Sequence, residues 1–490
     1  MSWALYTILA APLAATLVSL RASWRIAWTL SVAAGIVALG VAILIGLDVC
    51  HGRVIQAAGG WLRIDPLGAV FLLGTALVYS MACVFSVGYL GVEQGSRGFT
   101  GFARRYFALL DLFGAVMLLV PLASDFGVLW VGVELTTIVS ALLVAIDRTD
   151  AALEAAWKYV LIASSGLGIA LLAIVVMYAT GTHVFGSAYI PRFTRFIARA
   201  HALSPEAVKL AFVLAVVGFG TKVGFFPVHT WLPDAHSEAP APASAMLSGS
   251  LLAAAFYAIL RFFQVAVANG DRAFAEHVLI VFGAASLIAA SFFVLRQGNF
   301  KRLLAYSSIE HMGIIALGVG FGAPLAVAGA LLHVITHASA KGLAFLSSGS
   351  LLRGYDTKQV EQVTDAGRRM PWTGPMFLTA VLALSGLPLS GVFRSEFEIV
   401  AGGFSQGQYV GVALLLVFAN LAFFGVSWHA GSMVLSRSGP ASETVRERSP
   451  WMIAGMAGCL FVVVALGVHL PGDLADLLSS ARHVLEVPRA

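Results

Sequence analysis

Long uninterrupted runs of hydrophobic residues alternate with short polar segments along the chain. A helix that crosses a bilayer needs about 20 mostly apolar residues, and about fourteen runs of that length are present. None shows the apolar–polar alternation of a transmembrane barrel strand. The pattern predicts an all-α polytopic membrane protein with helices centred on Ala10, Val37, Leu77, Val116, Val139, Leu171, Val217, Leu252, Ala285, Ile314, Leu332, Val381, Leu416 and Val462.

Composition agrees with this fold class and excludes others. Of the 490 residues, 59% are hydrophobic and 11% charged, whereas soluble domains are roughly 25% charged. The net charge of +5 does not indicate nucleic-acid binding, because the basic residues are spread over many connections. Cys50, Cys83 and Cys459 lack the close spacing of cluster, haem or zinc ligands. We therefore expect no redox cofactor and no metal ion in this chain.

Basic residues in the connections predict the orientation, because Lys and Arg of short loops stay on the cytoplasmic side. Seventeen of them, including Arg97, Lys301 and Arg437, lie in odd-numbered connections, and eight, including Arg261, lie in even-numbered ones. The odd-numbered connections are therefore expected on the cytoplasmic side of the cell membrane. Both termini should then face outward.

Two ionisable residues lie in the middle of apolar stretches. Glu134 occurs in LWVGVELTTIVSALLVA, and Lys222 occurs in AFVLAVVGFGTKVGFFPVH. A charged side chain at mid-membrane costs about 2.5–3.5 kcal/mol on insertion scales, so such residues usually mark an ion path. Pro227 should also break the second of these helices, because proline lacks the backbone donor.

The polar segment after this break offers further groups that exchange protons. Its prolines, Pro227, Pro233, Pro240 and Pro242, are expected to prevent a regular helix. It also carries His229, Asp234, His236 and Glu238. A proton relay and a hydrogen-bonded loop between helices are equally compatible with this composition.

A second polar helix carries His333, His337 and Lys341 at spacings of four residues, which places them on one helical face. The two histidines could bind zinc, but no H-E-x-x-H form or third ligand accompanies them. A row of proton carriers is the favoured interpretation, since histidine titrates near neutral pH. Glu310 and His311 form a further pair, expected at a helix start, where a cap and a functional role are equally compatible.

A third polar element, ALSGLPLSGVFRSEFEIVAG, is interrupted by Pro388. Glu396 follows the break, with Arg394 and Glu398 on either side of it. A broken helix with a nearby charge thus occurs twice, which is typical of inverted-repeat transporters. We expect two inverted five-helix repeats in a chain divided into a three-helix segment (1–100), a first half (101–270), a second half (271–437) and a C-terminal helix with a short tail (438–490).

Four of these motifs together resemble a known family. They are KVGFFPVHTWLPDAHSEAP from Lys222, KRLLAYSSIEHMG from Lys301, HVITHASAKGLAFLSSGS from His333 and GLPLSGVFRSEF from Gly386. In this order they resemble the antiporter-like membrane subunits of respiratory complex I and group 4 membrane-bound hydrogenases. The stretches RRYFALLDLFGAVMLLVPLASDFGVLWVGVE and ALEAAWKYVLIASSGLGIALL are most similar to component F of hydrogenase-4 and formate hydrogenlyase-type complexes.

The resemblance implies fourteen helices and a proton path along a central polar axis. It implies that Glu134 and Lys222 form an ion pair that tunes protonation, and that Glu396 is the terminal group of the path. His333, His337 and Lys341 match the family's connecting histidines and lysine. In the eighth helix, where family members place Lys or His, this chain has Ser248 and Ala253, so the link between the halves is an open question at the sequence level.

The expected function is proton translocation coupled to electron transfer in partner subunits. Charged Glu134 would hold Lys222 protonated, and a redox event in a nickel–iron, iron–sulfur, NADH or quinone subunit would send the proton towards Lys341 and Glu396. The chain itself would do no redox chemistry. Two alternatives are a subunit of a multi-subunit sodium/proton antiporter and a membrane scaffold without transport, for which Ser248 and Ala253 are the argument.

Overall fold

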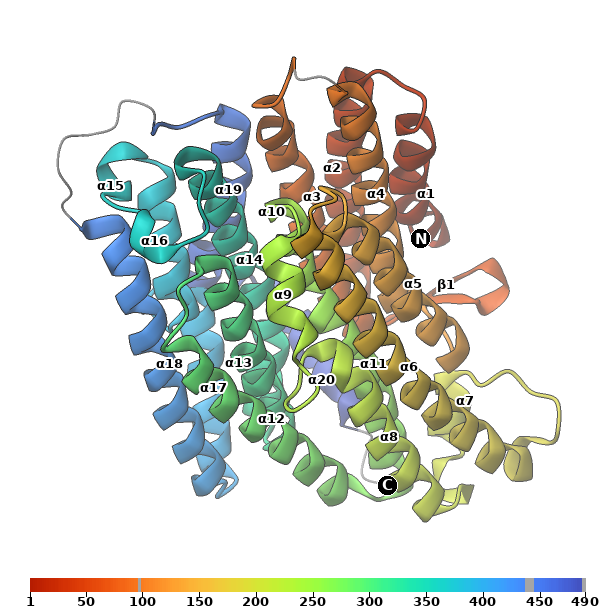
Figure 1. Cartoon of the computed structure of the whole chain (residues 1–490). Coiled ribbons are helices and arrows are strands. Elements are labelled where there is room, and N and C mark those ends of the chain that lie inside the picture. Colours follow the sequence, from red (N-terminus) through yellow and green to blue (C-terminus); the bar gives the residue numbers. More distant parts are fainter. Residues whose placement is uncertain (96–97, 437–444, 487–490) are drawn as a thin grey trace.

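A computed structural model describes residues 1–95, 98–436 and 445–486. Figure 1 shows a bundle of long helices that run up and down through the molecule. Arg97 and Arg437, which contributed to the predicted orientation, lie outside the described residues, as does the predicted boundary at 437/438.

The described helices form fourteen crossings. Eleven are long and apolar enough to span a membrane, and α8, α14 and the pair α16/α17 supply three more. Every predicted helix centre falls within one of them, so the predicted fold class is confirmed. In chain order they are α1 (Ser2–Ser19), α2 (Trp24–Val49), α3 (Pro66–Gly91), α4 (Phe99–Leu119), α5 (Phe126–Val144), α6 (Asp150–Phe185), α8 (Pro205–Val223) with α9 (Trp231–Glu238), α10 (Ala241–Met246) with α11 (Leu252–Asn269), α12 (Arg272–Val294), α13 (Phe300–Gly320), α14 (Pro324–Tyr355), α16 (Thr373–Leu384) with α17 (Gly391–Ser405), α18 (Tyr409–Leu435) and α19 (Pro450–Val468).

Short elements fill the connections. An antiparallel hairpin pairs β1 (Ile55–Ala57) with β2 (Leu62–Ile64). A C-terminal helix, α20 (Gly472–Leu485), packs against α3. The remaining pieces are α7 (Phe193–Ala198), α15 (Ala366–Arg369), the 3₁₀ turns Ala58–Gly60, Val120–Leu122, Ala200–Ala202 and Val360–Gln362, and a π-helical turn at Leu247–Leu251.

Two five-crossing units make up the centre of the bundle. The first contains α4, α5, α6, α8/α9 and α10/α11, and the second contains α12, α13, α14, α16/α17 and α18, which lie on opposite sides in Figure 1. Each crossing reverses the direction of the chain, so the first crossing of one unit, α4, and the first crossing of the other, α12, run in opposite directions. The two units are therefore inverted relative to each other. In each unit the fourth crossing, α8/α9 or α16/α17, is the broken one.

The first break lies between Val223 and Trp231 and contains Pro227. The expectation that prolines exclude helix from the following segment is wrong, because α9 and α10 form there. Pro233 lies in the first turn of α9 and Pro242 in that of α10. Proline is tolerated at these positions, because a first-turn N–H has no partner within the helix.

The second break lies between Leu384 and Gly391 and contains Pro388. Gly386 has a φ of 73°, a conformation that favours glycine. The hydroxyl of Ser390 accepts a hydrogen bond from Phe393 N at 3.1 Å and caps the start of α17. Both predicted breaks are therefore present, and a new helix begins after each of them, in the middle of the bundle.

Candidate functional site

Lys222 lies in the last turn of α8, directly before the first break, and is fully buried. Its ammonium donates hydrogen bonds to Thr137 Oγ1 and to Tyr159 Oη, the latter at 2.8 Å. The same nitrogen lies 4.9 Å from the centre of the Tyr159 ring. The lysine is thus surrounded by neutral hydroxyl and aromatic groups.

Glu134 lies at the middle of α5, as expected, but it makes no salt bridge with Lys222, the residue with which the resemblance pairs it. Its Oε1 accepts a hydrogen bond from Ser164 Oγ at 2.9 Å. No oxygen of Glu134 lies within 4.0 Å of Lys222 Nζ, a statement that covers two fully described side chains. Thr137, one helical turn after Glu134, provides the α5 contact to Lys222. The carboxylate therefore acts on the lysine across a hydroxyl layer.

His236 on α9 is buried near this pocket. Its Nδ1 lies 2.8 Å from Leu232 O, and its Nε2 has no hydrogen-bond partner among the described residues. Trp231 stacks on Tyr159 at 4.4 Å between ring centres and links α9 to the Lys222 pocket. His236 is thus held by its own helix, with one nitrogen left for proton exchange.

His229 lies within the first break and is 5% exposed. Its ring lies 5.6 Å from that of Phe226 and 5.7 Å from that of Phe293. Nδ1 has no partner in the described part of the chain. The structure therefore brings His229 to an aromatic pocket and not into contact with His236 or Lys222.

A pair of serine hydroxyls joins the two units. Ser248 lies in the π-helical turn Leu247–Leu251, and its hydroxyl is 2.7 Å from that of Ser308 on α13. Both side chains are fully buried. Such π-turns inside helices frequently occur at functional sites. The eighth crossing thus contacts the second unit through a hydroxyl in place of a charged group, while Ala253 contributes only apolar packing.

Lys341 on α14 lies close to this pair and is fully buried. Its ammonium donates to Leu304 O at 2.9 Å and to the hydroxyl of Ser307. Ser308 donates to the same Leu304 carbonyl at 3.0 Å. Lys341 and the Ser248–Ser308 pair therefore share one backbone acceptor.

Three histidines meet beyond Lys341. His311 Nδ1 lies 3.0 Å from His333 Nε2, and His333 Nδ1 lies 2.9 Å from Ser395 Oγ. His337 lies on the same face of α14, with its ring centre 5.2 Å from that of His311, and neither of its nitrogens has a partner among the described residues. The predicted stripe on α14 is therefore extended by a residue of α13.

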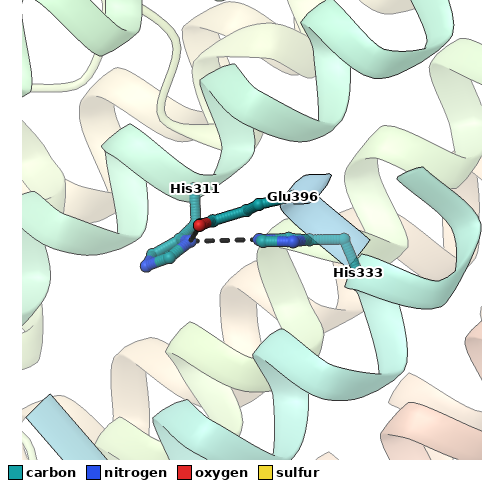
Figure 2. A group of neighbouring side chains, drawn as sticks. All are labelled: His311, His333 and Glu396. Carbon is teal, nitrogen blue, oxygen red and sulfur yellow. Dashed lines mark hydrogen bonds and ion pairs between the residues drawn. The ribbon is translucent and has the colours of Figure 1, made fainter. Parts of the chain in front are cut away.

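Glu396 on α17 completes this histidine cluster. Figure 2 shows Glu396, His311 and His333 pointing toward one another, and Glu396 Oε1 lies 3.8 Å from His311 Nδ1. Glu396 and Glu310 also line a cavity of about 230 Å³ between α13, α17 and α18. The carboxylate thus connects a buried hydrogen-bonded chain to an open space.

The same three residues are the group among the described side chains that could hold a metal ion. One ligand atom from each of His311, His333 and Glu396 lies within 4.8 Å of the other two. The two imidazole nitrogens are hydrogen-bonded to each other, however, so one of them carries a proton. The arrangement seen here is a hydrogen-bonded histidine pair with a carboxylate beside it.

Comparisons with known proteins agree with this geometry. The family described as NADH:quinone oxidoreductase/Mrp antiporter, TM matches residues 123–422, more than half of the chain. The chain belongs to this family. A relative named hydrogenase-4 component F homolog, from Methylacidiphilum infernorum, is 33% identical over 427 residues, which cover 85% of this chain and 87% of that protein.

Two further relatives of this antiporter-like subunit are informative. NADH-quinone oxidoreductase subunit N of Desulforudis audaxviator is 31% identical over 390 residues, covering 78% of this chain and 75% of that protein. A chain in the structure of the Mrp complex from Dietzia sp. DQ12-45-1b has the same fold, with a TM-score of 0.87 and 19% identity over 100% of this chain and 98% of that one. Its relatives are thus subunits of multi-subunit membrane complexes.

Some residues of the polar axis of this antiporter-like subunit were misplaced or missed at the sequence level. Glu310 and His311 were expected at a helix start, but they lie at the middle of α13, which begins ten residues earlier at Phe300. Their position inside a long apolar span was the available signal. Thr137 and Tyr159 carried no signal of their own, because only the folded chain brings them to Lys222.

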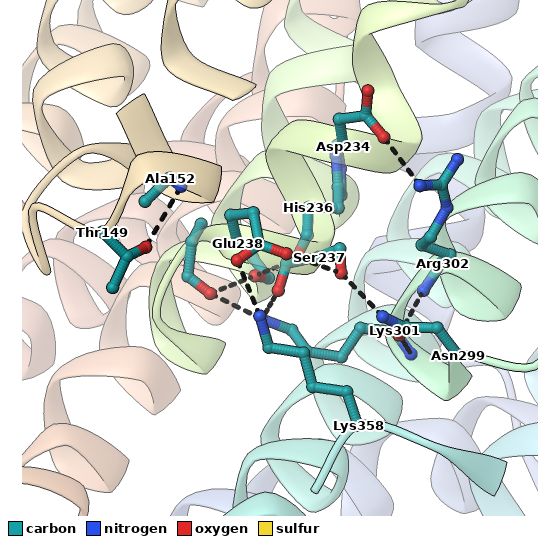
Figure 3. A network of polar contacts seen from close by, with 12 residues as sticks. Thr149, Ala152, Asp234, His236, Ser237, Glu238, Asn299, Lys301, Arg302 and Lys358 are labelled. Carbon is teal, nitrogen blue, oxygen red and sulfur yellow. Dashed lines mark hydrogen bonds and ion pairs between the residues drawn. The ribbon is translucent and has the colours of Figure 1, made fainter. Parts of the chain in front are cut away.

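Other charged residues near the breaks are held in ion pairs. Asp234 pairs with Arg302 at 2.9 Å, and Glu238 pairs with Lys358 at 2.8 Å (Figure 3). On α17, Arg394 pairs with Glu398, at 3.2 Å. These contacts favour the structural interpretation of Asp234 and Glu238 in the segment after Pro227.

Arg261 was expected in a connection that sets the orientation, but it is buried within α11. Its guanidinium donates to Asp65 Oδ1 at 2.7 Å and to Tyr257 Oη at 2.8 Å. Burial raises the pKa of Asp65, but the charges of Arg261 and Arg63 together outweigh burial and lower it well below its usual range. Arg261 is thus a structural cation of this antiporter-like subunit.

Proposed function

We propose that this chain translocates protons through the membrane along its buried polar axis. The carrying observation is that Lys222 and Lys341, one in each unit, are fully buried and bonded only to neutral groups. Buried ionisable side chains in spanning helices are costly and usually belong to an ion path. The Ser248–Ser308 hydrogen bond, which lies between the units, supports a link between them and counts against a transport-inactive scaffold.

The geometry supports a stepwise electrostatic mechanism. A negative charge on Glu134 favours the ammonium form of Lys222 across Thr137, because opposite charges attract strongly in a low-dielectric interior. When that charge is neutralised or screened, burial favours the neutral amine and Lys222 releases its proton. Hydroxyls can donate one hydrogen bond while accepting another, so Ser248 can pass a proton to Ser308. The Ser308 hydroxyl shares the Leu304 carbonyl with the Lys341 ammonium, which places the proton beside Lys341.

The second unit then discharges the proton. Lys341 repels positive charge from the neighbouring histidines, so its deprotonation allows a proton to enter the cluster of His333, His337 and His311. Glu396, whose Oε1 lies 3.8 Å from His311 Nδ1, accepts the proton from the cluster once the two groups approach to hydrogen-bond distance, and releases it to the adjacent cavity. His229 and His236 also carry protons near the first break, beside the main path.

The setting we propose is a hydrogenase-4, formate hydrogenlyase-type or complex I-like oxidoreductase of the plasma membrane. The similarity to a hydrogenase-4 component F homolog over most of both chains supports it. Partner subunits with nickel–iron, iron–sulfur, NADH or quinone sites would carry the electrons. We further propose that both termini lie on the outer side, which an even number of crossings supports. The segments 1–100, 101–270, 271–437 and 438–490 are the proposed functional divisions.

Lys222→Met tests this function in the purified complex reconstituted in vesicles. We expect proton uptake, followed with a pH-sensitive dye, to fall to the background of empty vesicles while the complex still assembles on native gels. Lys209→Met is the matched control, because this lysine of the same helix pairs with Asp271 at the surface, at 3.0 Å. Wild-type uptake by Lys222→Met would exclude the proposed path.

A second candidate function is sodium/proton exchange within a multi-subunit antiporter. The fold likeness to a chain of the Mrp complex, over the full length of this chain, favours this candidate. The same vesicles distinguish the two candidates. Proton movement that depends on a sodium gradient and on no electron donor identifies exchange, whereas donor-dependent movement without sodium identifies redox coupling.

A further inference from the structure

Lys301 is a third buried lysine, and it does not behave as a loop cation. It is the second residue of α13 and is 1% exposed. The sequence pattern assigned it to the connections that set the orientation. The neighbouring Arg302 fits that assignment, because its side chain is 40% exposed and pairs with Asp234.

The ammonium of Lys301 is held by backbone carbonyls alone. It donates to Ser237 O at 3.0 Å and to Ala239 O at 2.5 Å, at the end of α9 (Figure 3). No described carboxylate lies within 4.0 Å of it. The charged groups that act on it from a distance are Lys358, Glu238 and Asp147, and Glu238 is already paired with Lys358.

This environment matches those of Lys222 and Lys341. All three lysines are at least 99% buried and bonded to neutral oxygens. A lysine of this kind can lose its proton without breaking an ion pair. An ammonium held by an aspartate, by contrast, would leave that carboxylate uncompensated.

Lys301 contacts both units at the end of the bundle where α9 ends and α13 begins; we call this end the loop side. Its side chain contacts α9 of the first unit, and its helix continues to Ser307 and Ser308 in the second. Its charge also acts on His236, one residue before Ser237. A cavity of about 370 Å³, lined by Glu154, Lys158, Asp234, Glu238 and Arg302, opens beside this end of α9.

We propose that Lys301 is a proton-exchanging residue of the path, through which protons from this loop-side cavity reach His236 and the serine pair. The inference rests on the proposed transport function and adds an entry group to it. The competing interpretation is structural: a lysine at the end of a helix neutralises the terminal carbonyls of α9.

Three substitutions at one position separate these interpretations. Lys301→Arg keeps the charge and the donors, but a guanidinium does not deprotonate in proteins. Lys301→Gln keeps a donor without charge, and Lys301→His restores a titrating group. In the reconstituted complex we expect the Arg and Gln variants to lose at least tenfold in proton flux. The His variant should keep measurable flux, with its pH profile displaced to lower pH.

The opposite pattern would overturn the proposal. Flux within twofold of wild type in either the Arg or the Gln variant that assembles shows that Lys301 only holds α9. Lys209→Met, which alters an ion pair with Asp271 outside this cavity, is the control and should leave flux unchanged. If Lys222→Met is inactive while Lys301→Arg has normal flux, the proposed transport function is retained and only the role of Lys301 is excluded. Normal flux in both variants excludes the transport path and the role of Lys301 together.

Discussion

The two broken helices occupy equivalent places in inverted units, but they are held differently. After the first break, α9 is fixed to the second unit by Arg302 and Lys358, which pair with its two carboxylates, and by Lys301 at its terminal carbonyls. After the second break, α17 presents Glu396 to a cavity that Glu310 also lines, and among the described basic side chains His311 lies within 4.0 Å of its carboxylate. One break is clamped and the other is open.

This difference indicates that the broken helix has a different role in each of the two units. The clamped break keeps Lys222 in a closed environment of hydroxyl and aromatic groups, where Glu134 controls its proton in the mechanism that we propose. The open break gives Glu396 access to space in which a proton can leave. The following changes test the contrast, beginning with the open break.

Glu396→Gln removes the proton-accepting group of the open break and keeps its shape. We expect proton flux in reconstituted vesicles to fall to background, because no other described carboxylate contacts the histidine cluster. Arg394→Gln, on the same helix but paired with Glu398, is the control and should retain at least half of the flux. Equal losses in both variants would show that α17 matters only for packing.

Asp65→Asn disturbs neither break and measures the stability of the frame around them. It leaves the buried Arg261 without its partner, which costs about 3–5 kcal/mol, so the unfolding temperature of the detergent-solubilised protein should fall. The pKa of Asp65 is lowered in the folded protein, so its contribution is complete above its unfolded value of about 3.9 and is lost as pH falls further. The difference from wild type should therefore be full at pH 7 and shrink only below about pH 4.

Ser248→Ala cuts the contact between the clamped unit and the open one. We expect flux to fall roughly tenfold, equivalent to about 1.4 kcal/mol on a rate-limiting step, and Ser248→Thr to restore part of it. Ser250→Ala is the matched control, since this buried hydroxyl of the same π-helical turn has no described partner. Equal effects at both positions would indicate a packing defect and not a lost relay.

Arg302→Gln removes one ion pair of the clamp, and its effect should be the smallest. The pair is partly exposed, and exposed pairs contribute about 0–1 kcal/mol. Flux should stay within threefold of wild type when measured beside Lys301→Gln. A tenfold loss would show that this single pair, and not the buried lysine, secures the first break.

The crossings and both breaks could be predicted because their causes are local. Helix length follows from apolar runs, and Pro227 and Pro388 interrupt their helices whatever the surrounding packing is, because proline lacks the backbone donor. The charges of Glu134, Lys222 and Lys341 within the apolar spans were equally recognisable, since an ionisable residue in an apolar run is conspicuous by itself. In each case a single stretch of sequence contains the whole argument.

The contacts between these residues could not be predicted, because they depend on how distant helices pack. Thr137 meets Lys222 from a segment 85 positions away, and His311 meets His333 across two helices. Lys301 looked like an orientation signal, since the sequence does not reveal that the end of α9 covers it. The proposed proton path therefore depends on packing between helices, although its charged residues can be recognised in the sequence.

The five-crossing unit has a consequence for how such a chain could arise. A unit with an odd number of crossings returns the chain to the opposite side of the membrane, so a tandem duplication of its gene inserts the second copy upside down. A unit of four or six crossings would give two copies in the same orientation. The clamped and open breaks can thus descend from one ancestral helix whose two copies met different sides of the bilayer and then diverged.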